Sequence, residues 1–259
     1  MTADSTAPIL DVREVSVRFG GIVALDRVSF QVEPGRIVGM IGPNGAGKTT
    51  LFNCLSRLYT PNEGEIQFQG RSLLAVRPHR VASLGIGRTF QDLAMFRSMT
   101  VLQNVMVGIH SHARSGFLAQ GLRLPSVVRE EAAVRDRARE MIAFVGIEAL
   151  ADQPVEGLAF GLLKRVEMAR ALASAPKLLL LDEPAGGLNH EEVQALVELI
   201  RQIRDRWHVT VLLVEHHMNL VMQVSEKVVV LDFGRCIADG SPAEVQRDPA
   251  VIQAYLGGP

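Results

Sequence analysis

The sequence has few of the features that mark several common protein classes. Its 259 residues include only two cysteines, Cys54 and Cys236, which are far apart and form no CxxC pair, so neither a zinc site nor a disulfide framework is indicated. Lysine and arginine total 27 against 28 aspartates and glutamates, a net charge of −1. This balance gives no support for a general nucleic-acid binder, which usually carries a basic excess.

Long apolar runs are also missing. The runs in KLLLLDEP, VTVLLVEH and KVVVLDF are far shorter than the ~20 residues of a membrane-spanning helix, and they are typical of buried parallel strands. The start, MTADSTAPILDV, has neither the basic region nor the apolar core of a secretory signal. We therefore expect any membrane role to be exercised from outside the bilayer, and a reducing compartment fits the two thiols.

What the sequence contains is a globular pattern of strands and helices, with 47% hydrophobic residues. Residues 9–33 alternate apolar and polar side chains, which predicts an antiparallel β region closed by a turn at Pro34 and Gly35. A strand (RIVGMI), a helix (TTLFNCLSRL) and a strand (EIQFQG) follow. Helical periods dominate from about residue 92 to residue 161, and strands alternate with helices again beyond it.

Capping residues predict where some helices begin and end. Ser126 and Gly146 are expected to start and stop a helix in the middle of the chain. Asn189 is expected to cap a later helix, and Ser241 with Glu244 to open the final one through a capping box. The middle helix has a polar face, REEAAVRDRARE, which we expect to be solvated. Its apolar face comprises Val127, Val134, Ala138, Met141 and Val145.

A glycine-rich loop after the strand RIVGMI fits the phosphate-binding pattern GxxxxGK[ST]. Glycines let backbone N–H groups face phosphate oxygens, and the N-terminus of the next helix adds partial positive charge. Lys48 is predicted to reach the β- and γ-phosphates, and the Thr49 hydroxyl to ligate Mg²⁺. The predicted nucleotide-binding residues of the loop are Gly42, Pro43, Asn44, Gly45, Ala46, Gly47, Lys48, Thr49 and Thr50.

The segment LLLLDEP supplies two adjacent carboxylates at the end of an apolar strand. Asp182 is predicted to hold Mg²⁺, and Glu183 to accept a proton from an attacking water molecule. One carboxylate for the metal and one for water favours a hydrolase over a passive binder.

Between these motifs, residues 158–172 read LAFGLLKRVEMARAL. With this spacing the chain resembles the ATP-binding subunit of ABC transporters over essentially its whole length, from Ile9 to Gly257. The resemblance implies an α/β fold, in which a P-loop NTPase core (about 9–91 and 162–257) carries an antiparallel β region and an inserted helical subdomain (about 92–161). It also implies ATP and Mg²⁺ as ligands.

The family pattern assigns further residues. Phe19 matches the aromatic that stacks on adenine, although an ordinary core aromatic fits this position too. Gln91 matches the glutamine that links the γ-phosphate and Mg²⁺ to the helical subdomain, or is a plain loop residue. His216 matches the histidine on the γ-phosphate, with His217 as its rival. Lys48, Glu183 and His216 thus form the expected catalytic set.

The closer resemblance is to the branched-chain amino-acid uptake ATPases of bacteria. It rests on GIGRTFQDLAMF, LLLLDEPAGGLN, VEHHMNLVM and the ending VIQAYLG. In the family, the LSGGQ-like segment contacts the γ-phosphate held by a partner subunit in a head-to-tail dimer. Ala159 is usual in the branched-chain subgroup, Phe160 for tyrosine is a mild departure, and Leu162 replaces a usual glutamine. We expect the backbone of Gly161 to keep this contact in trans, but more weakly, unless Leu162 simply packs in the helical subdomain.

The resemblance implies a set of partners at the cytoplasmic face of the cell membrane. These are a second ATP-binding subunit, identical or related, integral permease subunits and, indirectly, a solute-binding protein, with no nucleic acid. Residues Gly187, Leu188 and Asn189 match the loop where ATP-binding subunits meet, and Asn189 stands where aspartate is usual. Met95 and Phe96 suit either a permease groove or the core.

Three functions remain open from the sequence. The first is import of a small amino acid, with branched-chain amino acids as the family default. The second is transport of another cargo, such as urea, amides or an exported lipid or lipopolysaccharide. The third is an ABC ATPase acting on DNA or ribosomes, which the single ATPase domain and the absence of a heptad run disfavour.

Overall fold

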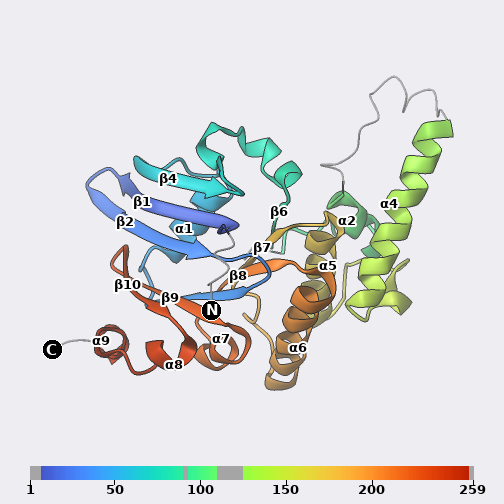
Figure 1. Cartoon of the computed structure of the whole chain (residues 1–259). Coiled ribbons are helices and arrows are strands. Elements are labelled where there is room, and N and C mark those ends of the chain that lie inside the picture. The colour runs from blue at the N-terminus through green and yellow to red at the C-terminus, as the bar shows by residue number, and fades with distance from the viewer. Residues whose placement is uncertain (1–6, 90–92, 110–124, 257–259) are drawn as a thin grey trace, which may run out of the picture. The chain divides into compact units, whose positions relative to one another are not determined.

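The computed structural model describes residues 7–89, 93–109 and 125–256 (Figure 1). They form two compact units. The first takes the described residues up to Val81 and from Lys177 onward, and the second takes those from Ala82 to Pro176. Within the described ranges, no helix is long and apolar enough to cross a membrane.

One sheet of the first unit is antiparallel, in the order β2-β1-β4-β5. Leu10 pairs with Val32 and Phe19 with Ile22, so β1 and β2 form a long hairpin, and the predicted antiparallel region is confirmed. The strands are β1 (Leu10–Phe19), β2 (Ile22–Val32), β4 (Glu63–Phe68) and β5 (Arg71–Ser72).

The second sheet carries the apolar runs. Within the first unit its strands run in the order β10-β9-β3-β8-β7, with β9, β3, β8 and β7 parallel and β10 antiparallel to β9. Every residue of β3, β7 and β8 is buried, as expected for strands covered on both faces. The strands are β3 (Ile37–Ile41), β7 (Leu178–Asp182), β8 (Thr210–Val214), β9 (Lys227–Asp232) and β10 (Arg235–Gly240).

Two helices of the first unit begin where the capping residues predict. The Asn189 side chain accepts a hydrogen bond from the Glu192 backbone at 2.9 Å, and Ser241 with Glu244 forms the second capping box. The prediction that Ser241 opens the final helix was wrong, because that helix is short and another follows it from Pro249. The helices are α1 (Lys48–Leu55), α6 (His190–Trp207), α7 (Met218–Val224), α8 (Pro242–Val245) and α9 (Pro249–Leu256), with 3₁₀ turns η1 (Leu73–Ala75) and η2 (Pro78–Arg80).

The second unit is mainly helical. It is wider at both ends than the expected segment 92–161, because a short strand, β6, and the whole of α5 fall within it. Its elements are η3 (Ala82–Leu84), β6 (Ile86–Arg88), α2 (Val101–Val107), α4 (Pro125–Phe144), η5 (Glu148–Leu150) and α5 (Phe160–Ala173).

Helix α4 is the middle helix that was predicted to start at Ser126 and to stop at Gly146. The prediction for Ser126 was wrong, because α4 begins at Pro125 and Ser126 lies inside its first turn. Gly146 does end the helix, since it adopts a φ of 74°. Its N–H donates to Ala143 and that of Ile147 to Ile142, a Schellman motif. The polar face carries the expected pairs, such as Arg135 with Glu131.

Candidate nucleotide site

The loop between β3 and α1 is held tightly on one side. Gly42 has a φ of 154°, and a Cβ atom there would lie 2.1 Å from the carbonyl oxygen of Leu231. Gly47 has a φ of 102°, and its Cβ would lie 2.6 Å from the oxygen of Ala24. Both positions therefore require glycine for backbone packing as well as for conformation.

The other side of the loop is open. A Cβ on Gly45 would meet no atom within 4 Å, and Asn44 is exposed. Helix α1 begins at Lys48, and its N-cap, Gly47, supplies no side-chain cap. An open concave loop at a helix N-terminus suits an anion such as a phosphate group.

Lys48 folds back over this loop. Its ammonium group donates hydrogen bonds to the carbonyl oxygens of Gly42 at 2.6 Å and Pro43 at 2.9 Å. Burial lowers the pKa of Lys48, and the nearby carboxylate of Glu183 partly opposes this shift. The lysine is thus close to both the loop and the acidic strand end.

Parallel strand register brings the remaining predicted residues to the same edge. Met40 in β3 pairs with Val214 in β8, and Val214 pairs with Asp182 in β7, so these three strands end at one level. Asp182 is buried there, and its carboxylate together with the exposed Thr49 hydroxyl offers the hard oxygen donors that Mg²⁺ prefers.

Glu183 follows Asp182 with a φ of 46°, a left-handed conformation rare for a non-glycine residue. Its N–H donates to the Val214 carbonyl oxygen at 2.9 Å, which fixes the backbone against β8. Strain of this kind often occurs at functional sites.

Of the two histidines, His216 is the one that approaches Glu183. Its Nδ1 lies 4.0 Å from a carboxylate oxygen of Glu183, and its side chain is 53% exposed. The ring of His217 lies beside it, with centroids 4.6 Å apart. This geometry favours His216 for the predicted role.

Sequence reasoning missed Glu215, which precedes both histidines. Its side chain is 0% exposed, and its carboxylate accepts hydrogen bonds from the backbone N–H groups of Ala185, His216 and His217. The only sequence signal was an acidic residue continuing the apolar run VTVLLV.

The predicted adenine residue lies at the end of β1. Phe19 is 46% exposed and makes an edge contact with Tyr59, with ring centroids 5.3 Å apart and planes at 71°. Its exposure favours a ligand-facing aromatic over a core residue. Tyr59, which buttresses it, was not predicted.

Three further predictions concern other segments. Gln91 lies outside the described residues. In the second unit, α5 begins at Phe160 and its N-cap, Ala159, makes no side-chain capping bond, while Gly161 and Leu162 are half-buried. In the first unit, Asn189 uses its side chain as the cap of α6.

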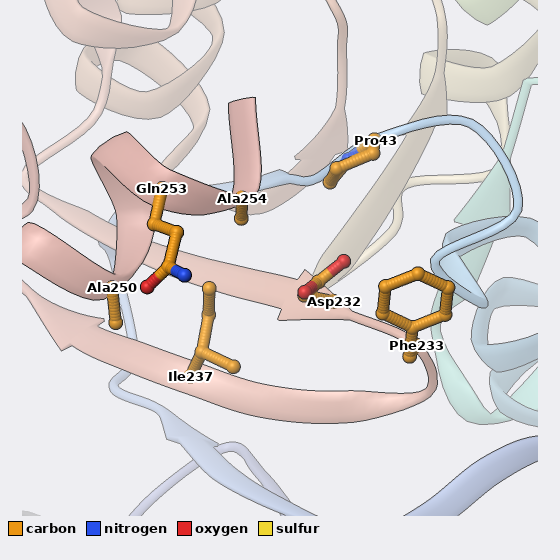
Figure 2. A pocket seen from close by; sticks show the side chains of 7 residues that line it. All are labelled: Pro43, Asp232, Phe233, Ile237, Ala250, Gln253 and Ala254. Carbon is orange, nitrogen blue, oxygen red and sulfur yellow. The ribbon is translucent and has the colours of Figure 1, made fainter. Parts of the chain in front are cut away.

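A cavity of about 490 Å³ borders the loop at Pro43. Figure 2 shows its walls: α9 on one side, and the turn at Asp232 and Phe233 on the other. The nearby Tyr255 phenol has a pKa raised by burial, an effect that a hydrogen bond with the Gly42 backbone opposes. Helix α9 therefore supports the start of the phosphate loop.

Comparisons with known proteins agree with this geometry. Residues 25–186 match the family described as ABC transporter, and residues 235–259 match a family described as branched-chain amino acid ATP-binding cassette transporter. The second match contains α9.

Two relatives and one solved structure cover nearly all of the chain. The chain is 42% identical to the high-affinity branched-chain amino acid transport ATP-binding protein BraF of Pseudomonas aeruginosa, and 40% identical to LivG of Escherichia coli K12. Each alignment covers 96% of this chain and 98% of the relative. A crystal structure of an ABC transporter ATP-binding cassette in its ADP conformation is 30% identical, with a TM-score of 0.84, over 98% of this chain and 100% of that one. The chain thus belongs to the ATP-binding subunits of ABC transporters, and its fold is the α/β cassette of these ATPases.

Proposed function

We propose that this chain binds ATP with Mg²⁺, hydrolyses it, and thereby energises import of branched-chain amino acids. The proposal of hydrolysis rests on one observation. Four side chains with the required chemistry lie at one sheet edge: Lys48, Asp182, Glu183 and His216. The cargo is supported by the names of BraF and LivG and by the match of residues 235–259.

In this proposal the phosphate chain of ATP lies in the loop 42–50, and the adenine stacks on Phe19. Lys48 exchanges its bonds to the Gly42 and Pro43 carbonyl groups for bonds to the β- and γ-phosphates. Thr49, Asp182 and Gln91 would hold Mg²⁺, which neutralises charge on the transferring phosphoryl group.

Glu183 then accepts a proton from the water that attacks the γ-phosphorus. His216 donates a hydrogen bond to a γ-phosphate oxygen and keeps the water in line. A positioned base of this kind contributes about 10²–10⁴-fold to the rate. The backbone of Glu183 is held in this turn by the bond from its N–H to the Val214 carbonyl oxygen, which needs no substrate.

The site is completed by a second ATP-binding subunit, identical or related. Its segment equivalent to Gly161 would contact the γ-phosphate of this chain, and Gly161 of this chain would do the same for the partner. Permease subunits would dock on the second unit, where Phe96 is exposed. The assembly would work at the cytoplasmic face of the cell membrane with a solute-binding protein outside.

Uptake of labelled leucine into cells tests the cargo. Cells that lack this chain should lose the uptake and regain it with the intact chain, but not with Lys48→Ala. Normal leucine uptake without the chain, together with loss of uptake of another solute, would contradict the assignment.

A further inference from the structure

The buried carboxylate of Glu215 has no part in the function proposed above. It lies directly after β8, and its side chain is 0% exposed. Removing a carboxylate from water lowers the stability of a fold unless hydrogen bonds compensate for the lost hydration. The bonds made by Glu215 therefore show what holds it there.

Both carboxylate oxygens of Glu215 accept backbone hydrogen bonds, and they do so from two different loops. Oε1 accepts from the N–H of Ala185 at 2.7 Å. Oε2 accepts from the N–H groups of His216 at 3.0 Å and His217 at 3.2 Å. One side chain thus connects the loop after β7 to the loop after β8.

These two loops carry Glu183 and His216. Ala185 is two residues beyond Glu183, and His216 is the residue after Glu215, so each end of the carboxylate is anchored beside one of them. The Glu183 carboxylate and the His216 Nδ1 are 4.0 Å apart, and Glu215 Oε2 is 3.8 Å from the same Nδ1. The Glu183 N–H also donates to the Val214 carbonyl oxygen at 2.9 Å, which joins the ends of β7 and β8. Glu215 extends this connection into the two loops, at Ala185 and at His216.

We propose that Glu215 is a positioning residue that sets the spacing between Glu183 and His216 for ATP hydrolysis. The proposal rests on the function proposed above for those two residues. Glu215 itself touches neither substrate nor metal in this account; it acts by holding the backbone on both sides of the reacting centre. This role requires that both carboxylate oxygens accept hydrogen bonds.

Replacing Glu215 with glutamine separates this role from packing. Glutamine has nearly the same size and shape, but its NH₂ group donates and cannot accept. Whichever way the amide is turned, N–H groups of one loop would face an NH₂ group. A residue that mattered only for packing would tolerate this change.

Glu226→Gln is the matched control. Glu226 is a partly buried glutamate, less buried than Glu215, and it pairs with Arg36 and Arg204 at the opposite ends of the strands, away from the two loops. Its loss should lower thermal stability and leave turnover within about twofold of the wild type.

The test combines ATPase kinetics with amide hydrogen exchange on the full chain, together with its partner subunits where turnover requires them. We expect Glu215→Gln to lower kcat at least tenfold with KM for ATP within about threefold. The amides of Ala185, His216 and His217 should exchange at least tenfold faster, while those of β7 and β8 keep their protection. Glu226→Gln should leave both the kinetic constants and the exchange of these three amides close to those of the wild type.

The proposal is overturned if Glu215→Gln leaves kcat unchanged. It is also overturned if Glu226→Gln lowers kcat as much as Glu215→Gln does when the two variants have lost equal stability. If Glu215→Gln does not fold, hydrogen exchange of the wild-type chain still tests the proposal. Rapid exchange of the Ala185 amide in the wild type would refute the connection between the loops. If the wild type hydrolyses no ATP while these amides are protected, the proposed function fails and the connection between the loops stands.

Discussion

Replacing Gly42 with alanine tests the packing of the phosphate loop. The new Cβ would lie 2.1 Å from the Leu231 carbonyl oxygen, so the loop must move by about 1.3 Å to restore an ordinary contact of 3.4 Å. Overpacking of this kind costs about 1–3 kcal/mol, and a φ of 154°, which side chains other than glycine rarely adopt, adds about 1–3 kcal/mol. For a chain of this size, a total of about 2–6 kcal/mol corresponds to a fall in Tm of roughly 4–24 °C.

Two further glycines separate these contributions. Gly70 and Gly45 have φ values of 73° and 81°, and a Cβ at either meets no atom within 4 Å. Each alanine variant should therefore lose only the conformational part, about 1–2 kcal/mol. Gly70→Ala should retain ATP affinity, whereas Gly42→Ala and Gly45→Ala should lose it, as measured by calorimetry. A Gly42→Ala chain as stable as Gly70→Ala would refute the reasoning.

Three more predictions concern other parts of the chain. Leu162→Gln should raise the ATPase rate of the assembled transporter several-fold, because one added neutral hydrogen bond to the partner's nucleotide contributes about 0.5–1.5 kcal/mol. An unchanged rate would show that Leu162 does not limit the closing of the two ATP-binding subunits on ATP. Burial raises the pKa of Cys54 from 9.0 to about 11, so the contribution of this thiol to stability should be full below pH 9 and be lost as pH rises toward 11; the fall in stability over that range should be smaller in Cys54→Ala, as measured by thermal melts. Asn104 is fully buried and donates to the carbonyl oxygens of Phe96 and Thr100, so Asn104→Ala should destabilise the chain by about 1–3 kcal/mol in urea titrations, and a smaller loss would contradict its role in holding that loop.

The phosphate loop and the strand LLLLDEP could be predicted from sequence because their chemistry is local. A glycine pattern between an apolar strand and a helix specifies a loop conformation within a few residues. The same holds for Asn189, whose capping bond reaches only three residues along the chain to Glu192. Gly146 belongs with them, since a left-handed C-cap depends on one residue.

Interactions between segments could not be predicted in this way. Glu215 gains its role only because strand register brings Ala185, from a different loop, within 2.7 Å of its carboxylate. The contact between Phe19 and Tyr59 likewise joins residues that are distant in sequence. Ser126 was wrongly taken as an N-cap because Pro125 can itself occupy the first turn of a helix.

The most direct test of the proposed mechanism is ATP hydrolysis by Glu183→Gln in the assembled transporter, with ATP binding measured alongside. Glutamine keeps the size of the side chain but accepts no proton, so we expect ATP affinity near that of the wild type and phosphate release slower by about 10²–10⁴-fold. Phosphate release at the wild-type rate in this variant would contradict the assignment of Glu183 as the base.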